Sequence, residues 1–130
     1  MKLACCGDDC AACPRYIATQ SGDQRLLQRA AEIWLQVGWR DDLSAPADMV
    51  CHGCRTAAGC HYGIRDCTLA QGLDHCGQCR QYPCDKLQQT FARTAAYAQK
   101  CRQVCSDQEY AVLARAFFNK QENLESSRRG

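Results

Sequence analysis

Residues 51–84 read CHGCRTAAGCHYGIRDCTLAQGLDHCGQCRQYPC, and this stretch decides the expected fold. It holds seven cysteines and five glycines but few large apolar side chains. A segment so poor in apolar area needs another source of order, and bound metal is a common one in small domains. We therefore expect residues 51–84 to form loops that are held together by cysteine-bound metal.

Two helices are expected on the N-terminal side of this stretch. Residues 14–20 begin with a proline, which favours the first turn of a short helix. Ser21 and Gln24 have the spacing of a capping box, and Gly38 supplies a stop signal for the helix that follows. Between them, apolar residues recur at helical spacing: Leu26, Leu27, Ala30, Ala31, Trp34 and Val37. Residues 38–50, with three Asp, one Ser and one Pro, break the helical pattern and are expected to be a connecting loop.

On the C-terminal side, residues 85–124 predict further helices. One apolar face is expected at Leu87, Phe91, Ala95, Ala98, Cys101 and Cys105, and a second at Tyr110, Leu113, Ala114, Phe117 and Leu124. Ser106 and Glu109 form another capping-box signature between these faces. No strand pattern of useful length occurs. The expected fold class is mainly α, with one small helical domain over residues 1–130 and cysteine-rich metal-binding loops between the helices.

The chain has 13 cysteines among 130 residues, a density that suggests either a secreted disulfide scaffold or a metal-binding protein. The count is odd, close pairs recur, and the first residues lack the apolar stretch of a secretory signal. These features favour metal binding in a reducing compartment, so we expect a cytoplasmic protein. The basic residues are spread along a chain of net charge +2, and apolar runs are short. We expect no nucleic-acid or membrane partner, while a protein partner stays open.

The spacing of the cysteines predicts which of them bind metal. The candidate ligands are Cys6, Cys10, Cys13, Cys51, Cys54, Cys60, Cys67, Cys76, Cys79 and Cys84. Two Cys-x2-Cys pairs complete a tetrahedral zinc site, so the first expected site joins the pair at 51 and 54 to the pair at 76 and 79. The second expected site joins the cysteines at 6, 10 and 13 to Cys84, with Cys67 as the rival fourth ligand.

Zinc in a closed, structural role is the first hypothesis, and two other metals remain open. An iron–sulfur cluster for electron transfer or sensing also uses cysteine thiolates. A copper(I) or soft-metal store is the third hypothesis, since thiolates suit such ions. The Cys-x3-Cys-x2-Cys spacing at residues 6–13 occurs in radical enzymes, but the strands of their barrel are missing. We find no nucleophile–base pair and no phosphate loop, so no catalytic residue is assigned and a non-enzymatic role is expected.

Six further residues have two interpretations each. Cys101 and Cys105 lie four apart, so on a helix they share a face as buried small apolar groups or as a ligand pair. Cys5 is an extra thiol beside Cys6. The histidines at 52, 61 and 75 each neighbour a cysteine and are either ligands or loop residues that hydrogen-bond to a thiolate.

Four stretches in the same order carry a resemblance to a known family. They are CGDDCAACPRYIAT at 6–19, CHGCR at 51–55, IRDC at 64–67 and CGQCRQYPCDKL at 76–87. Over residues 6–91 the chain resembles the cysteine-rich bacterial and archaeal proteins called domain of unknown function 3795, which are described as zinc-binding. Asp8 stands where that family usually has Leu, and Gly63 stands where many relatives carry another cysteine. The resemblance implies metal binding and no reaction, and it places a site that uses Cys60 in doubt.

Overall fold

The computed structural model describes residues 1–54 and 63–129. The α-helices in these residues are α1 (Pro14–Ser21), α2 (Gln24–Gln36), α3 (Ile64–Ala70), α4 (Asp85–Val104), α5 (Asp107–Leu113) and α6 (Lys120–Arg129). The short turns are η1 (Cys10–Ala12), η2 (Pro46–Met49), η3 (Cys76–Gln78) and the π-helical η4 (Ala114–Phe118). Within these residues the only β pairing is one isolated bridge, between Leu3 and Asp9. The expected mainly α fold class is confirmed.

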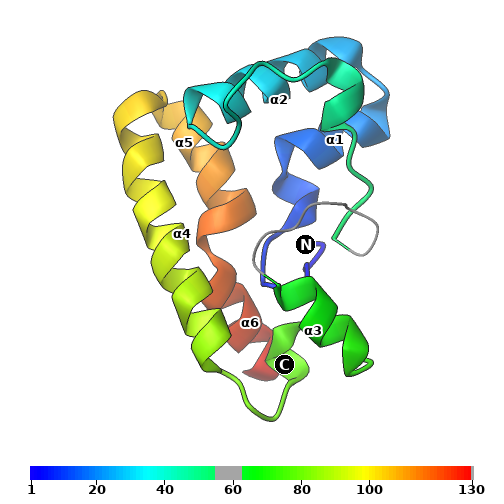
Figure 1. The fold of residues 1–130 in the computed structure, drawn as a ribbon, viewed down its shortest axis with the longest axis vertical. Coiled ribbons are helices and arrows are strands. Elements are labelled where there is room, and N and C mark those ends of the chain that lie inside the picture. The colour runs from blue at the N-terminus through cyan, green and yellow to red at the C-terminus, as the bar shows by residue number, and fades with distance from the viewer. Residues whose placement is uncertain (55–62, 130) are drawn as a thin grey trace.

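Figure 1 shows how the helices are arranged around the N-terminal segment. Helix α4 runs along one side of the molecule, and α5 and α6 return beside it. Helices α1 and α2 lie at one end, while α3 lies at the other end near the last turns of α6. Among the described residues, no helix combines the length and the apolar content that crossing a bilayer requires.

The first two helices form as expected, but a different residue caps the second one. Gly22 ends α1 in the left-handed conformation with φ 69°, so Ser21 is the last residue of α1. The cap of α2 is Asp23, whose carboxylate accepts a hydrogen bond of 2.8 Å from the N–H of Arg25. The predicted capping box at Ser21 is therefore wrong, because the αL glycine separates that residue from the helix it was expected to cap.

Residues 51–84 contain more regular structure than their composition predicted. Helix α3 begins after Gly63, and its side chains Ile64 and Thr68 are buried. The buried Thr68 hydroxyl donates a hydrogen bond of 2.8 Å to the Ile64 carbonyl, so its polar group has a partner within α3. Residues 55–62, which include the candidate ligand Cys60 and the candidate His61, lie outside the described part of the chain.

The buried face of α4 matches the predicted one only in part. Leu87 and Cys101 are buried as predicted, but Thr90 and Thr94 are also buried and Ala95 is exposed. The prediction followed apolar residues alone, but the buried positions 87, 90, 94 and 101 are those that share one helical face. Two threonines therefore occupy positions that a simple apolar pattern does not reveal.

The last predicted helix is interrupted. Its start is as expected, because the Ser106 hydroxyl accepts from the Glu109 N–H and the Glu109 carboxylate accepts from the Ser106 N–H. The chain then passes from α5 through the π-helical turn η4 to Asn119, after which α6 begins. Figure 1 shows that α6 continues beyond this break, beside α4, toward the end of the molecule where α3 lies.

Two buried clusters hold these elements together. One joins α1, α2, α5 and the end of α4, with Leu27, Trp34 and Leu113 among its buried residues. The other joins the N-terminal segment, α3, the start of α4 and α6, with Ile64 and Leu124 among its buried residues. Both clusters include buried cysteines, which are Cys13 and Cys101 in the first cluster and Cys5 and Cys6 in the second.

Candidate metal centres

Nine cysteines line two separate pockets. The four-cysteine pocket is bordered by Cys67, Cys76, Cys79 and Cys84. The five-cysteine cavity is bordered by Cys6, Cys10, Cys13, Cys51 and Cys54. None of the twelve cysteines in the described residues is in a disulfide, so these thiols are available to bind metal.

The four-cysteine pocket is small and is built from three neighbouring elements. Cys67 comes from α3, Cys76 from η3, and Cys84 directly precedes α4. The free volume is about 40 Å³, which accommodates an ion but not an organic molecule. A set of four sulfur donors is the chemistry of a closed zinc site.

Polar side chains engage the thiols of this pocket. The Gln71 amide donates to the Cys67 sulfur at 3.3 Å, and its oxygen lies 3.7 Å from the Cys79 sulfur. The Thr68 hydroxyl lies 3.4 Å from the Cys76 sulfur. Burial is the main cause that raises the pKa of Cys76. The hydrogen bond with Thr68 lowers this pKa, and the other thiols of the pocket raise it further. This raised pKa favours the protonated thiol.

Helix α6 holds the turn between Cys76 and Cys79 in place. The Arg128 guanidinium donates to the Gly77 carbonyl at 2.7 Å and to the Cys79 carbonyl at 3.3 Å. The same guanidinium lies 4.8 Å from the centroid of the Tyr82 ring. Three contacts from one side chain therefore fix the backbone that presents two of the thiols.

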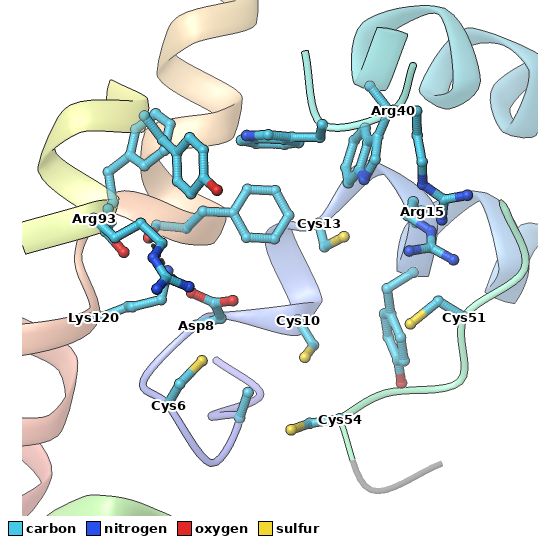
Figure 2. A pocket seen from close by; sticks show the side chains of 18 of the residues that line it. Cys6, Asp8, Cys10, Cys13, Arg15, Arg40, Cys51, Cys54, Arg93 and Lys120 are labelled. Carbon is cyan, nitrogen blue, oxygen red and sulfur yellow. Dashed lines mark hydrogen bonds and ion pairs between the residues drawn. The ribbon is translucent and has the colours of Figure 1, made fainter. Parts of the chain in front are cut away.

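The five-cysteine cavity is much larger, with about 650 Å³ of free volume. Figure 2 shows the cysteines gathered in one part of the cavity. Cys51 and Cys54 belong to one chain segment, and they face Cys6 and Cys10 of the N-terminal segment. Arg15 anchors the end of η2, which leads to Cys51, because its Nε donates to the Met49 carbonyl at 3.0 Å. An aromatic wall closes another side, where the rings of Trp34 and Trp39 meet edge to face at 5.0 Å.

Cations also line the five-cysteine cavity. They are Arg15, Arg40, Arg93 and Lys120, and Asp8 is the one carboxylate among the lining residues. The Lys120 ammonium is buried and lies 2.7 Å from the Asp8 carboxylate. Burial raises the pKa of Asp8, whereas the charge and hydrogen bond of Lys120 lower it.

Burial also dominates the electrostatics of the cavity thiols. It raises the pKa of Cys10 to about 12 and that of Cys13 to about 11. Nearby negative charges raise the pKa of Cys10 further. Cys13 contributes most, then Asp8, and then Cys54 and Cys51. The thiols of Cys13, Cys54 and Cys51 therefore lie near enough to Cys10 to affect its pKa.

Backbone N–H groups lie close to several of the cysteine sulfurs. The Gln81 N–H donates to the Cys79 sulfur at 3.4 Å. Backbone hydrogen bonding from Tyr16 and Arg15 lowers the pKa of Cys13, and that from Asp8 lowers the pKa of Cys6, in both cases against the larger effect of burial. Such N–H groups stabilise the thiolate form that binds metal.

The grouping of the cysteines differs from the expected pairing. Cys51 and Cys54 lie in the five-cysteine cavity, not with Cys76 and Cys79. Cys84 joins the latter pair, not the N-terminal cysteines. The reason is tertiary: Arg15 ties residues 48–50 to α1, which brings the 51–54 turn to the N-terminal cysteines.

As the side chains are placed, no three Cys, His, Asp or Glu residues in 1–54 and 63–129 form a group that could hold a metal ion. Metal binding therefore requires the thiols of each pocket to turn toward a common centre.

The histidines contribute less than their positions suggest. His75 caps η3, because its Nδ1 accepts from the Gly77 N–H at 3.1 Å, and its Nε2 lies 3.1 Å from the Ser127 hydroxyl. Both ring nitrogens are thus engaged. His52 is exposed.

The remaining cysteines belong to the core. Cys101 is 1% exposed within the first cluster, and Cys105, the residue that caps the end of α4, packs against that cluster. Cys5 is buried in the second cluster, and its carbonyl accepts the Cys76 N–H at 2.9 Å. This hydrogen bond joins the N-terminal segment directly to the four-cysteine pocket.

Sequence spacing alone did not identify the residues from the C-terminal helices that border or support the two pockets. Thr94 of α4 and Lys120 of α6 line the cavity, and Arg128 of α6 holds the pocket. The available signal was the spacing of Lys120, Leu124 and Arg128, which at intervals of four share one face of a helix.

Comparison with known proteins identifies one family. The family model described as Protein of unknown function (DUF3795) matches residues 2–89. No curated protein and no solved structure matches the chain. The matched region contains every cysteine of both pockets, while α5 and α6 lie beyond it.

Proposed function

We propose that this chain, which belongs to the family described as Protein of unknown function (DUF3795), is a zinc-binding protein that uses cysteine thiolates at two centres. The supporting observation is that nine cysteines gather in two pockets of four and five. The family name states no activity, so the proposal depends on this grouping and on the donor chemistry.

The four-cysteine pocket is proposed as a structural zinc site. Four thiolates complete the coordination of zinc and leave no position for water or substrate. The pocket's small volume and the N–H donor to Cys79 support that assignment. Bound zinc would replace the contacts that Gln71 makes with two of the thiols, and would join α3 to η3 and to the start of α4.

The five-cysteine cavity is proposed as the second centre. It has one more thiol than a tetrahedral ion needs, so four ligands remain if one cysteine serves another purpose. The buried thiols of Cys10 and Cys13 would release protons when the ion binds, because the metal binds thiolates and not thiols.

An iron–sulfur cluster in the five-cysteine cavity is a second candidate. A cluster occupies far more space than a single ion, and the cavity volume of about 650 Å³ allows it. The cations that line the cavity would also balance the negative charge of a thiolate-bound cluster.

Elemental analysis of protein purified without oxygen and without added metal tests both candidates. We expect about two zinc per chain, about one in Cys79→Ser and little visible absorption in either. The matched control is Cys105→Ser, which alters a cysteine outside both pockets and should retain both ions. Iron with sulfide and a broad band near about 400 nm would replace zinc with a cluster. Protein without any bound metal would overturn the proposal.

A further inference from the structure

One cysteine pair of the five-cysteine cavity is presented by the same kind of turn as a pair in the four-cysteine pocket. Residues 10–16 read CAACPRY and residues 76–82 read CGQCRQY, so both have the spacing Cys-x2-Cys-x2-Tyr. The turns η1 and η3 each end on the second cysteine, at φ −72° and ψ 126° for Cys13 and at φ −76° and ψ 139° for Cys79. The N–H of that cysteine donates to the carbonyl of the first, at 3.1 Å in η1 and 3.0 Å in η3.

The contacts around the two turns match as well. The residue before each turn caps it: the Asp9 carboxylate accepts from the Ala11 N–H at 3.0 Å, and the His75 Nδ1 accepts from the Gly77 N–H at 3.1 Å. Each of the two tyrosines has a cation over its ring, at 5.5 Å and 4.8 Å from the centroid. The four-cysteine pocket has only the four thiols that zinc requires, so both thiols of η3 are needed there. The matching turn η1 is therefore suited to supply two ligands to the cavity.

Helix α1 holds the second pair of the cavity, Cys51 and Cys54, beside the first. Cys13 is the N-cap residue of α1. From the same helix the Thr19 hydroxyl accepts the Cys51 N–H at 2.9 Å, and Arg15 bonds the backbone that leads into the pair. Burial is the main cause that raises the pKa of Cys13, and the charge of Cys51 raises it further. One helix thus brings together two Cys-x2-Cys pairs, which is the number that a tetrahedral site requires.

Cys6 is held by a different helix. Its turn is closed by the Ala4 N–H, which donates to the Asp8 carbonyl at 2.8 Å. The same turn is joined to α6 by the Asn123 amide, which donates to the Gly7 carbonyl at 2.9 Å. Burial raises the pKa of Cys6 most, and the charge of Asp8 raises it more than the neighbouring thiol does. Cys6 therefore interacts more strongly with this carboxylate than with that thiol.

The Asp8 carboxylate forms a separate polar group with Cys6. Burial raises the pKa of Asp8, whereas Lys120 and then a hydrogen bond from Cys6 lower it. The Lys120 ammonium lies 2.7 Å from Asp8 and also donates to the Phe117 carbonyl at 2.7 Å. Figure 2 shows Cys6 at the edge of the cysteine group, on the side of Asp8 and Lys120. Binding of Cys6 to metal would remove a hydrogen bond from a buried carboxylate, which is unfavourable.

We infer that the two Cys-x2-Cys pairs of the five-cysteine cavity hold its metal ion, and that Cys6 stays off the ion and donates to Asp8. The four ligands are Cys10, Cys13, Cys51 and Cys54. The assignment rests on the proposed function and goes further, because it names the thiol that is not a ligand. Cys6 lies near Cys54, so it is the thiol able to replace Cys54 when that ligand is removed.

Two matched variants test the assignment on the full chain, purified without oxygen. Cys6→Ser and Cys13→Ser make the same change at two buried cysteines of the cavity. We expect Cys6→Ser to retain about two zinc per chain, as the wild type does, and Cys13→Ser to retain about one. Cobalt(II) in place of zinc gives a second readout, because its sulfur-to-metal charge-transfer absorption increases with the number of bound thiolates. This absorption should be unchanged in Cys6→Ser and fall by about half in Cys13→Ser.

Loss of an ion from Cys6→Ser would overturn the assignment and leave the zinc proposal intact, as would two retained ions in Cys13→Ser. A wild type without metal would instead overturn the proposed function itself. The thermal midpoint of each variant is measured alongside, because Cys6 is only 6% exposed. If Cys6→Ser does not fold, Cys6→Ala takes its place, since alanine adds no polar group to the buried turn. It should likewise retain both ions, and loss of one would contradict the assignment.

Discussion

The two cysteine groups differ in free volume, in surrounding charge and in what lies beside them. The four-cysteine pocket has about 40 Å³ and one lining cation, Lys86. The five-cysteine cavity has about 650 Å³, four cations and an aromatic wall. A small set of four thiols suits an ion that only stabilises the fold. A roomy, basic cavity beside thiols suits an ion or cluster that meets a ligand. On this comparison we propose that the metal of the four-cysteine pocket has a structural role and that the five-cysteine cavity has a different one.

Removing one thiol from each group should produce the largest contrast. Cys79→Ser leaves three thiols in its pocket, so we expect loss of that zinc and destabilisation on the order of 5 kcal/mol. Cys54→Ser leaves four thiols in its cavity, and the effect on stability should be much smaller. Urea unfolding with zinc analysis measures both, with Cys105→Ser as the control. Equal destabilisation by the two variants would remove the proposed division of roles.

A methyl group at Gly7 should disturb the contact between the cavity and α6. Gly7 has φ 101°, and an added Cβ would lie 2.5 Å from the Lys120 carbonyl oxygen. Strain and overlap together should cost about 3 kcal/mol in Gly7→Ala. Gly22 also has positive φ but open space around it, so Gly22→Ala should cost about 1 kcal/mol. Chemical denaturation of the two variants measures the difference in their free energy of unfolding. Similar losses of stability would mean that α6 shifts to make room for the added methyl group.

The Arg128 contacts should matter for the four-cysteine pocket alone. Arg128→Ala removes two hydrogen bonds to the backbone around Cys79 and the contact with the Tyr82 ring. We expect a loss of about 1–2 kcal/mol and faster transfer of one zinc to a chelator. Arg129→Ala is the control, since it removes the same charge one residue later. Faster release of both ions would show that α6 supports the two centres as one unit.

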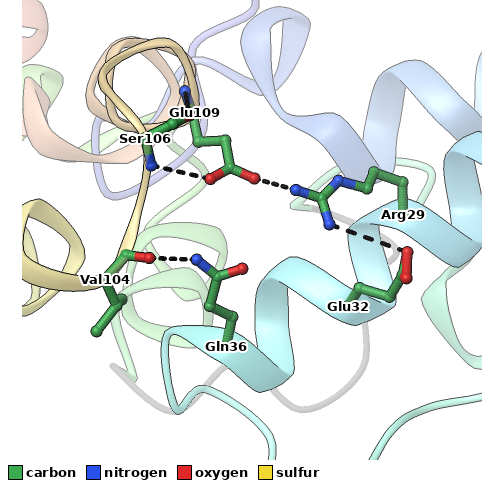
Figure 3. Close-up of polar contacts among 6 residues, drawn as sticks. All are labelled: Arg29, Glu32, Gln36, Val104, Ser106 and Glu109. Carbon is green, nitrogen blue, oxygen red and sulfur yellow. Dashed lines mark hydrogen bonds and ion pairs between the residues drawn. The ribbon is translucent and has the colours of Figure 1, made fainter.

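The smallest effect should come from a contact remote from both groups. Figure 3 shows Glu109 bonded to the Ser106 N–H and paired with Arg29 of α2, while Gln36 donates to the Val104 carbonyl. The hydrogen bond from Ser106, aided by Arg29, lowers the pKa of Glu109. The folded state therefore favours the ionised carboxylate, and its contribution is present above the ordinary carboxyl pKa and lost as pH falls through the folded pKa.

We expect Glu109→Gln to cost about 0.5 kcal/mol at pH 7, because half of the Arg29 side chain is exposed and solvent screens the pair. The difference from wild type should shrink below about pH 4.5, which thermal unfolding across pH 3–7 measures. Both zinc ions should stay bound at pH 7. Loss of either ion would mean that the centres depend on the packing of α2 against α5.

Local sequence signals predicted several elements correctly. The Ser106–Glu109 capping box starts α5 as expected, and the proline at 14 starts α1. The same signals failed where chain geometry competed with them. Gly22 in the αL conformation moved the cap of α2 to Asp23, and the low apolar content of residues 51–84 concealed α3.

The partners of each cysteine turn could not be predicted from spacing. A Cys-x2-Cys turn can share a metal with any second cysteine turn that lies beside it. The spacing of the cysteines therefore does not tell which second turn is its partner. The approach is set by distant contacts, such as Arg15 with the Met49 carbonyl and Cys5 with Cys76. The expected ligands themselves remain predictions that the metal analysis tests.

The sequence by itself determined a mainly α fold, an excess of thiols and a family relationship, because these follow from composition, local spacing and ordered motifs. Tertiary structure alone decided that the thiols divide into a four-cysteine pocket and a five-cysteine cavity. It also placed Arg93, Thr94 and Lys120 beside the cavity, from positions that follow the matched region in the chain. The physical reason is that helix packing, over contacts more than a hundred residues apart such as Asn123 with Gly7, determines which side chains share a space.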